Sequence, residues 1–250
     1  MSSVNHREPI VTMSWDDGHP LDLRVAELMA KYGMRGTFYV PVRNNEHKVM
    51  GKGDIVKISS EFEIGGHTLN HIKLTEISSE DEIYREISIG KTVMEDSIGK
   101  DITTFAYPKG CYNRQIKHLV KKAGFKGARS ASWFHDEYPD DLFCIHPTIH
   151  IYPHNFPTHV GHLIKELNSR GLNEYMLSYR GTTDLKKLIA CYLDKILAKG
   201  GVLHIWGHSW EIDELGLWVE LEEIMSYISE FKNVMHLTNG EIISYMEKQP

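Results

Sequence analysis

Two adjacent carboxylates, Asp16 and Asp17, directly follow an apolar run at residues 10–15. At such a place a buried strand opens into a loop. Burying one ionised carboxylate is costly, and burying two side by side costs more. A fold tolerates such a pair when a metal ion binds one carboxylate and a reaction uses the other. The pair therefore indicates a catalytic site.

Two histidines that follow a later apolar stretch could complete a metal site. His67 and His71 are four residues apart, which places them on one face if Thr68 begins a helical turn. With Asp17 they form a three-ligand set that leaves positions open for water and a substrate oxygen. A metal held there could polarise a carbonyl group. The alternative is that both histidines are ordinary polar loop residues.

Asp16 is not expected to bind the same metal as Asp17, because neighbouring side chains at a strand end point apart. Its predicted role is that of a general base, which takes a proton from the attacking water. Arg129 is the candidate for a positive group that orients this base. The alternatives are a turn-forming or helix-capping role for Asp16 and a surface position for Arg129.

A third segment offers a general acid. His208 is predicted near the rim and could protonate a leaving amine, whereas His204 is expected in the core. Glu211 either orients an imidazole or caps the following segment. Trp206 and Trp210 are interpreted as core or lid residues, or as walls of a sugar or acyl pocket.

Alternating strands and helices are predicted to position these residues. Strands are predicted near residues 10–15, 35–40, 62–67, 102–107, 125–128, 142–149, 201–206 and 234–237. Helices are predicted at residues 21–32, 54–59, 79–98, 113–123, 183–199, 217–231 and 241–247. We therefore expect one α/β domain over residues 1–250, built as a deformed parallel (β/α) barrel of about seven to eight strands.

The carboxyl ends of parallel barrel strands form one rim, where active sites lie. The predicted strands bring the carboxylate pair, His67, Arg129 and His208 to that rim. Residues 132–179 break the alternation and are rich in His, Pro and aromatic residues. They are expected to form an irregular insertion over one end of the barrel.

The composition limits the class of protein. Apolar residues make up 41% and charged residues 25%, ordinary values for a globular protein, and the net charge of −6 argues against a nucleic-acid partner. The three cysteines form no CxxC pattern, so neither a disulfide framework nor a cysteine zinc site is expected.

No apolar run approaches the roughly 18 residues that span a membrane, and residues 1–8 lack the pattern of a secretory signal. The expected location is cytoplasmic.

Three stretches resemble signature motifs of the polysaccharide deacetylase family, also called the NodB-homology domain or carbohydrate esterase family four. They are Asp16-Asp17-Gly18, His67-Thr68-Leu69-Asn70-His71 and Phe105-Ala106-Tyr107-Pro108-Lys109-Gly110. His208 resembles part of a fourth motif. The resemblance extends over nearly the whole chain, from Val11 to Glu211.

The resemblance implies a deformed (β/α) barrel and metal-dependent removal of an N- or O-acetyl group. It implies Asp16 as the base, His208 as the acid and the three ligands named above around a metal, usually zinc. The backbone N–H groups near Tyr107 to Lys109 are expected to help stabilise the tetrahedral oxyanion.

The sequence departs from the family pattern at two positions. The third motif usually carries an arginine where this chain has Ala106, and Arg129 is our hypothesis for its replacement. The aspartate that usually orients the catalytic histidine has no clear counterpart, and Asp136 is the candidate that remains.

The leading hypothesis is a zinc-dependent N-deacetylase that acts on a small or lipid-linked acetylated sugar. The alternatives are a hydrolase of a non-sugar amide and a non-catalytic carbohydrate-binding protein. Binding alone would need neither Asp16 nor His208. A two-carboxylate glycosidase is disfavoured, because adjacent aspartates do not flank a glycosidic bond at the roughly 5–9 Å that its chemistry needs.

Overall fold

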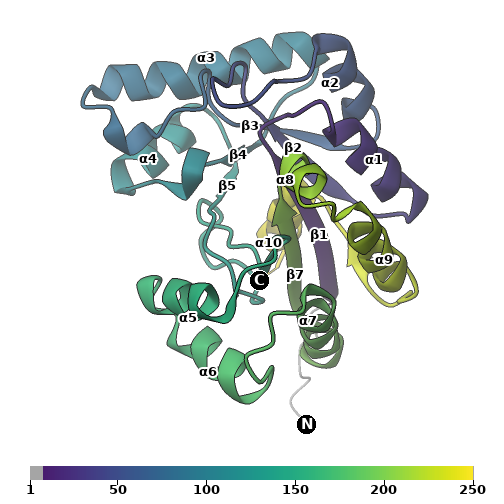
Figure 1. Ribbon diagram of the computed structural model, residues 1–250. Coiled ribbons are helices and arrows are strands. Elements are labelled where there is room, and N and C mark those ends of the chain that lie inside the picture. Colours follow the sequence, from purple (N-terminus) through teal and green to yellow (C-terminus); the bar gives the residue numbers. More distant parts are fainter. Residues whose placement is uncertain (1–7, 250) are drawn as a thin grey trace.

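The computed structural model describes residues 8–249, in which strands and helices alternate. The strands are β1 (Pro9–Asp16), β2 (Gly36–Val40), β3 (Glu63–Gly66), β4 (Thr104–Ala106), β5 (Gly127–Arg129), β6 (Ile149–His150), β7 (Gly201–Gly207) and β8 (Met235–His236). They pair in parallel in the order β5-β4-β3-β2-β1-β7-β6, and β8 pairs with the first part of β1. The sheet curls into a half-barrel (Figure 1), which confirms the predicted deformed parallel barrel in a single α/β domain.

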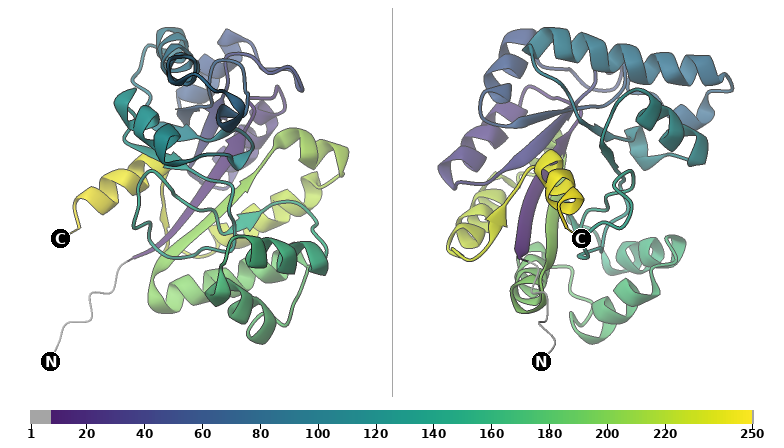
Figure 2. Two further views of the ribbon diagram at one scale, coloured as in Figure 1. Left: turned by 90° about the vertical axis from the view of Figure 1, so that its left-hand side faces the viewer. Right: turned by 180° about the vertical axis from the view of Figure 1, so that it is seen from behind.

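Helices lie around the curled sheet. They are α1 (Asp22–Lys31), α2 (Lys52–Ser59), α3 (Glu80–Ile98), α4 (Arg114–Lys122), α5 (Phe156–Lys165), α6 (Ser169–Leu177), α7 (Leu185–Lys199), α8 (Ser209–Glu214), α9 (Trp218–Ser229) and α10 (Asn239–Glu247). The side chains of Ser79 and Asn113 cap α3 and α4 at the predicted positions. Figures 1 and 2 place α3 and α4 at one end of the molecule and α5, α6 and α7 at the other, where α5 and α6 pack on each other.

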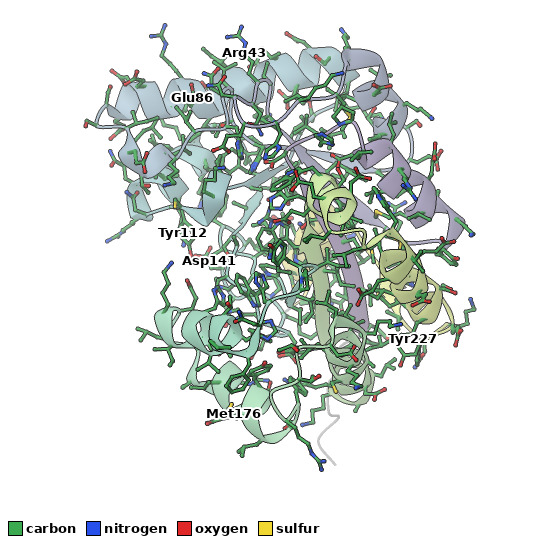
Figure 3. All side chains as sticks on the ribbon, in the orientation of Figure 1. Arg43, Glu86, Tyr112, Asp141, Met176 and Tyr227 are labelled. Carbon is green, nitrogen blue, oxygen red and sulfur yellow. The ribbon has the colours of Figure 1, made fainter. Side chains whose placement is uncertain are left out.

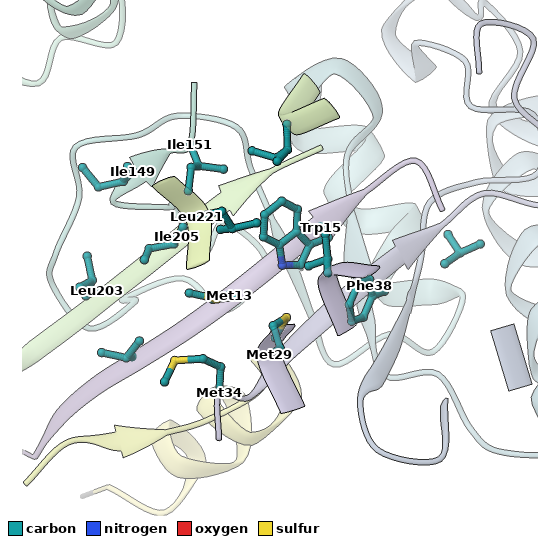
Figure 4. Packing of buried hydrophobic residues seen from close by; sticks show 14 of the residues in the cluster. Met13, Trp15, Met29, Met34, Phe38, Ile149, Ile151, Leu203, Ile205 and Leu221 are labelled. Atoms are coloured by element: carbon teal, nitrogen blue, oxygen red, sulfur yellow. The ribbon is translucent and has the colours of Figure 1, made fainter. Parts of the chain in front are cut away.

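The central strand β1 is buried on both faces, and the two faces differ in chemistry. Met13 and Trp15 belong to the apolar core, where Figure 4 shows them among other apolar side chains. The alternate residues are polar: Ser14 Oγ lies 2.8 Å from Nε2 of His204, which is fully buried as predicted. Asp16 is the last residue of this polar face, so the strand delivers it directly to the rim.

Residues 132–179 are more regular than predicted, because they contain α5, α6 and β6. The strand predicted at residues 142–149 is reduced to β6, and Ile145 makes only an isolated bridge to Arg129. Strand β5 ends at Arg129 rather than at residue 128. The arginine therefore lies within the carboxyl end of the strand instead of after it.

Within the described residues, no helix combines the length and apolar character that crossing a membrane requires. Cys111, Cys144 and Cys191 all lie in the described part of the chain and are free thiols. Residues 1–7, which carry most of the segment compared with a secretory signal, lie outside the described residues. The cytoplasmic location stays a prediction.

Candidate active site

The carboxyl ends of β1, β3 and β7 open into a cavity of about 570 Å³. Most of the predicted site residues line it; Arg129 and Tyr107 do not. One wall comes from the segment before α4, including Tyr112, which Figure 3 labels between α4 and α5. The opposite wall comes from α5 and residues 130–133. The cavity therefore lies between the two ends of the molecule.

Asp17, His67 and His71 form a compact, buried group whose ligand atoms all lie within 4.8 Å of one another. Asp17 Oδ1 is 3.0 Å from His71 Nε2 and 3.8 Å from His67 Nε2. The predicted helical turn is wrong: Thr68 and His71 adopt left-handed backbone conformations, with φ of 70° and 52°. These two bends, and not helical spacing, bring the imidazoles together.

The chemistry of this group fits a divalent metal. Within residues 8–249, no donor makes a hydrogen bond to the buried Asp17 Oδ1. His67 Nδ1–H donates to the carbonyl of Ala106 (2.8 Å), which leaves Nε2 as a bare lone pair facing Asp17. Burial lowers the pKa of His67 to about 4, so its imidazole is neutral at pH 7. Burial alone would raise the pKa of Asp17, but the His71 imidazole and the charge of His208 hold it well below its usual range.

Asp16 is held by groups on two other strands. The Arg129 guanidinium donates to both carboxylate oxygens of Asp16, and Trp206 Nε1–H donates to Oδ2 (3.0 Å). Arg129 is fully buried and lies 5.3 Å and 5.1 Å from the ring centroids of Tyr39 and Trp206. Burial alone would raise the pKa of Asp16, but the Arg129 charge lowers it below its ordinary value. The structure thus brings the predicted base and its predicted partner together.

His208 lies beside the metal-ligand group. Its Nε2 is 4.0 Å from Asp17 Oδ2, and its Nδ1–H donates to Glu211 Oε2 (2.7 Å). His150 Nε2 lies 3.1 Å from the same Glu211 oxygen. Burial opposes charge on His208, but the Glu211 carboxylate raises the pKa of the imidazole above its ordinary value. Glu211 therefore orients His208, the first of the two roles considered for it.

The other candidate for that orienting role, Asp136, lies elsewhere. Its carboxylate pairs with Lys195 (2.7 Å), and it does not line the cavity. His150 was not among the predicted site residues, because it belongs to the segment at residues 132–179 that was expected to be irregular. Its only signal was its place at the end of a possible strand, which the structure shows as β6.

Of the two residues predicted near the oxyanion, Lys109 lines the cavity and Tyr107 does not. The Tyr107 backbone N–H donates to the carbonyl of Arg129 (3.2 Å), and its hydroxyl donates to the carbonyl of Phe143 (2.9 Å). Because Tyr107 is 1% exposed and its N–H is used in the sheet, it cannot stabilise an oxyanion in the cavity. Lys109 does line the cavity, where its ammonium pairs with Glu46.

The two predicted tryptophans do more than form walls. Both line the cavity, and each donates its indole N–H to one carboxylate of the pair. Trp206 binds Asp16, and Trp210 donates to Asp17 Oδ2 (3.0 Å) while its ring stacks on His47 at 4.0 Å. The indoles thus fix both carboxylates, a function that the sequence did not reveal.

The sequence model described as Polysaccharide deacetylase matches residues 3–128. The chain belongs to the polysaccharide deacetylase family. The matched stretch contains the carboxylate pair and both metal-site histidines, whereas Arg129 and His208 lie beyond it. This membership makes the chain a hydrolase of the deacetylase type, as predicted. No curated protein matches the sequence.

Several solved structures share the deacetylase fold. A putative polysaccharide deacetylase from Mycobacterium smegmatis is 14% identical, with a TM-score of 0.63, 99% of this chain covered and 93% of that one. A family 4 acetyl xylan esterase from Clostridium thermocellum, in complex with a cobalt ion, is 16% identical, with a TM-score of 0.59. The match covers 95% of this chain and 92% of the esterase. The peptidoglycan deacetylase PdaC from Bacillus subtilis is 15% identical, with a TM-score of 0.57 and coverage of 98% and 96%. The likeness extends over the whole barrel.

Proposed function

We propose that this chain is a metal-dependent hydrolase that removes an N-acetyl group from a carbohydrate. The observation that carries the proposal is the arrangement around one cavity. The carboxylate of Asp17 and the imidazoles of His67 and His71 face one another, and the same cavity is lined by a carboxylate paired with an arginine and an imidazole paired with a glutamate. Family membership supports the deacetylase reaction.

Asp17, His67 and His71 are the proposed metal ligands, and zinc is the proposed ion, because one carboxylate and two imidazoles suit it. A metal bound there supplies Lewis acidity toward the acetyl carbonyl oxygen. The cobalt ion in the acetyl xylan esterase of the same fold is consistent with a divalent ion at such a site.

Asp16 is the proposed general base. Arg129 keeps its carboxylate ionised and in place, so it can accept a proton as water attacks the acetyl carbon. His208 is the proposed general acid, since the Glu211 carboxylate favours its protonated form and its Nε2 lies 4.0 Å from Asp17 Oδ2. As the amide C–N bond breaks, Nε2–H passes its proton to the leaving nitrogen. Acetate and a free amino sugar are the products.

A Glu211→Gln variant is expected to lose activity at lower pH than the wild type. The pKa of His208 is raised in the folded protein by Glu211, and the acid works only while it is protonated. Activity therefore falls as the pH rises through that pKa. Removing the Glu211 carboxylate lowers the pKa of His208, so the fall begins at lower pH. The measurement is kcat/KM against pH; an unmoved alkaline limb would show that Glu211 does not control the acid.

The substrate class is tested with small N-acetylated sugars, O-acetylated sugars and long acetylated polymers. Release of acetate together with a free amine from small N-acetylated sugars is the expected result. A lipid-linked N-acetylated sugar is the other expected substrate. A clear preference for long polymer, or hydrolysis of non-sugar amides only, would contradict the proposed substrate.

A further inference from the structure

Glu86 is a buried carboxylate on α3 that lies outside the cavity lining (Figure 3 labels it). Both of its oxygens accept hydrogen bonds from one residue. The Asn70 backbone N–H donates to Oε2 (3.0 Å), and the Asn70 side-chain amide donates to Oε1 (2.6 Å). Asn70 directly precedes His71, so this bidentate contact fixes the loop beside a proposed metal ligand.

The same helix also holds the beginning of the loop. The Glu86 carbonyl accepts a hydrogen bond from the Leu69 N–H (2.9 Å). One turn further on, a Cβ on Gly90 would lie only 2.7 Å from the Thr68 carbonyl carbon, so α3 approaches this loop as closely as a glycine allows. Between His67 and His71 the backbone is therefore in direct contact with α3.

This contact matters because the loop backbone is strained. Thr68 has φ of 70°, a conformation that β-branched residues rarely adopt, and His71 also lies in the left-handed region with φ of 52°. Strained backbone persists only where the surroundings hold it. Apart from α3, Val42 and Arg43 also hold the loop, because they donate backbone hydrogen bonds to the carbonyls of Thr68 and Leu69 (3.2 Å and 2.8 Å).

We propose that Glu86 is a positioning residue that sets the relative placement of His67 and His71, and through it the metal affinity of the site. The inference rests on the proposed metal ligands. Glu86 touches neither ligand side chain; it acts through Asn70 and the loop backbone. Residues that orient metal ligands in this way typically change affinity by one to two orders of magnitude when they are lost.

The test is a Co²⁺ titration of the full chain, followed by visible absorption, with four variants compared with the wild type. Glu86→Ala and Asn70→Ala remove the contact. Glu86→Gln restores it, because the Asn70 amide can turn and offer Oδ1 to the new amide nitrogen. Glu95→Ala is the matched control, since Glu95 on the same helix holds the backbone N–H of Ile102 (2.8 Å), away from the metal group.

The dissociation constant for Co²⁺ is expected to rise about 10–100-fold in Glu86→Ala and to stay near the wild-type value in Glu86→Gln and Glu95→Ala. Asn70→Ala is expected to weaken binding as well, and it decides the question if Glu86→Ala does not fold. Unchanged affinity in the folded Glu86→Ala and Asn70→Ala proteins, or equal weakening in Glu95→Ala, would overturn the inference alone. A wild-type protein that binds no Co²⁺ would overturn the proposed function itself.

Discussion

Replacing Asp16 by Asn is expected to lower kcat about 10²–10⁴-fold while the metal content stays unchanged. The carboxylate is the proposed base, and an amide of the same shape cannot accept the proton of the attacking water. Asn still offers an oxygen to Arg129, so the local packing is retained. The measurement is kcat on a small N-acetylated sugar, with metal content determined on the same sample.

The neighbouring Asp17→Asn variant is the matched control. Asp17 is the proposed metal ligand, so this variant is expected to lose metal and activity together. The same change in kcat and in metal content in both variants would contradict the proposal that Asp16 is the base and Asp17 a metal ligand. Loss of metal in Asp16→Asn would show in particular that Asp16 is itself a ligand.

Replacing Arg129 by Met is expected to destabilise the protein by about 3–5 kcal/mol, because it leaves the buried Asp16 carboxylate without its cation. The Arg129 charge lowers the pKa of Asp16, so the wild-type pair stabilises the fold above the unfolded pKa, and this contribution is lost as the pH falls through the lowered folded pKa. Without the arginine the pKa rises, and the acid limb of kcat/KM moves to higher pH.

Arg24→Met provides the control for this second prediction. Arg24 also lies over a tryptophan, with its guanidinium carbon 4.0 Å from the Trp218 ring centroid, but it is exposed and on α1. An exposed contact of this kind contributes only about 0.5–1 kcal/mol. Chemical denaturation compares the two variants. Equal losses of stability, with an unmoved acid limb in Arg129→Met, would remove Arg129 from its role beside the base.

The sequence revealed those site residues whose position follows from strand ends. Asp16, Asp17 and His67 end or directly follow strands of a parallel sheet, so strand prediction alone brings them to one rim. Arg129 also lies at the end of a strand. The prediction ended this strand at residue 128, one residue before the actual end of β5 at Arg129. The buried polar face of β1 was hidden, because both faces of that strand are covered and the run reads as apolar.

Other features depended on side-chain contacts between distant segments. Nothing in the spacing of His67 and His71 indicates left-handed bends at Thr68 and His71, which α3 holds in place. Whether Glu211 would reach His208 or cap a helix depends on the turn into α8. Tyr107 was placed in the cavity by resemblance, but its N–H is used by a sheet bond to Arg129 that no local pattern encodes.

The proposed function depends on Asp17, His67 and His71 binding a catalytic metal. The most direct test is elemental analysis of the purified wild-type protein beside a His67→Ala/His71→Ala double variant, with activity measured before and after adding zinc. We expect about one zinc or other transition metal per wild-type chain and none in the variant, with activity following the metal. A wild-type protein that holds no metal, and that no added metal activates, would contradict it.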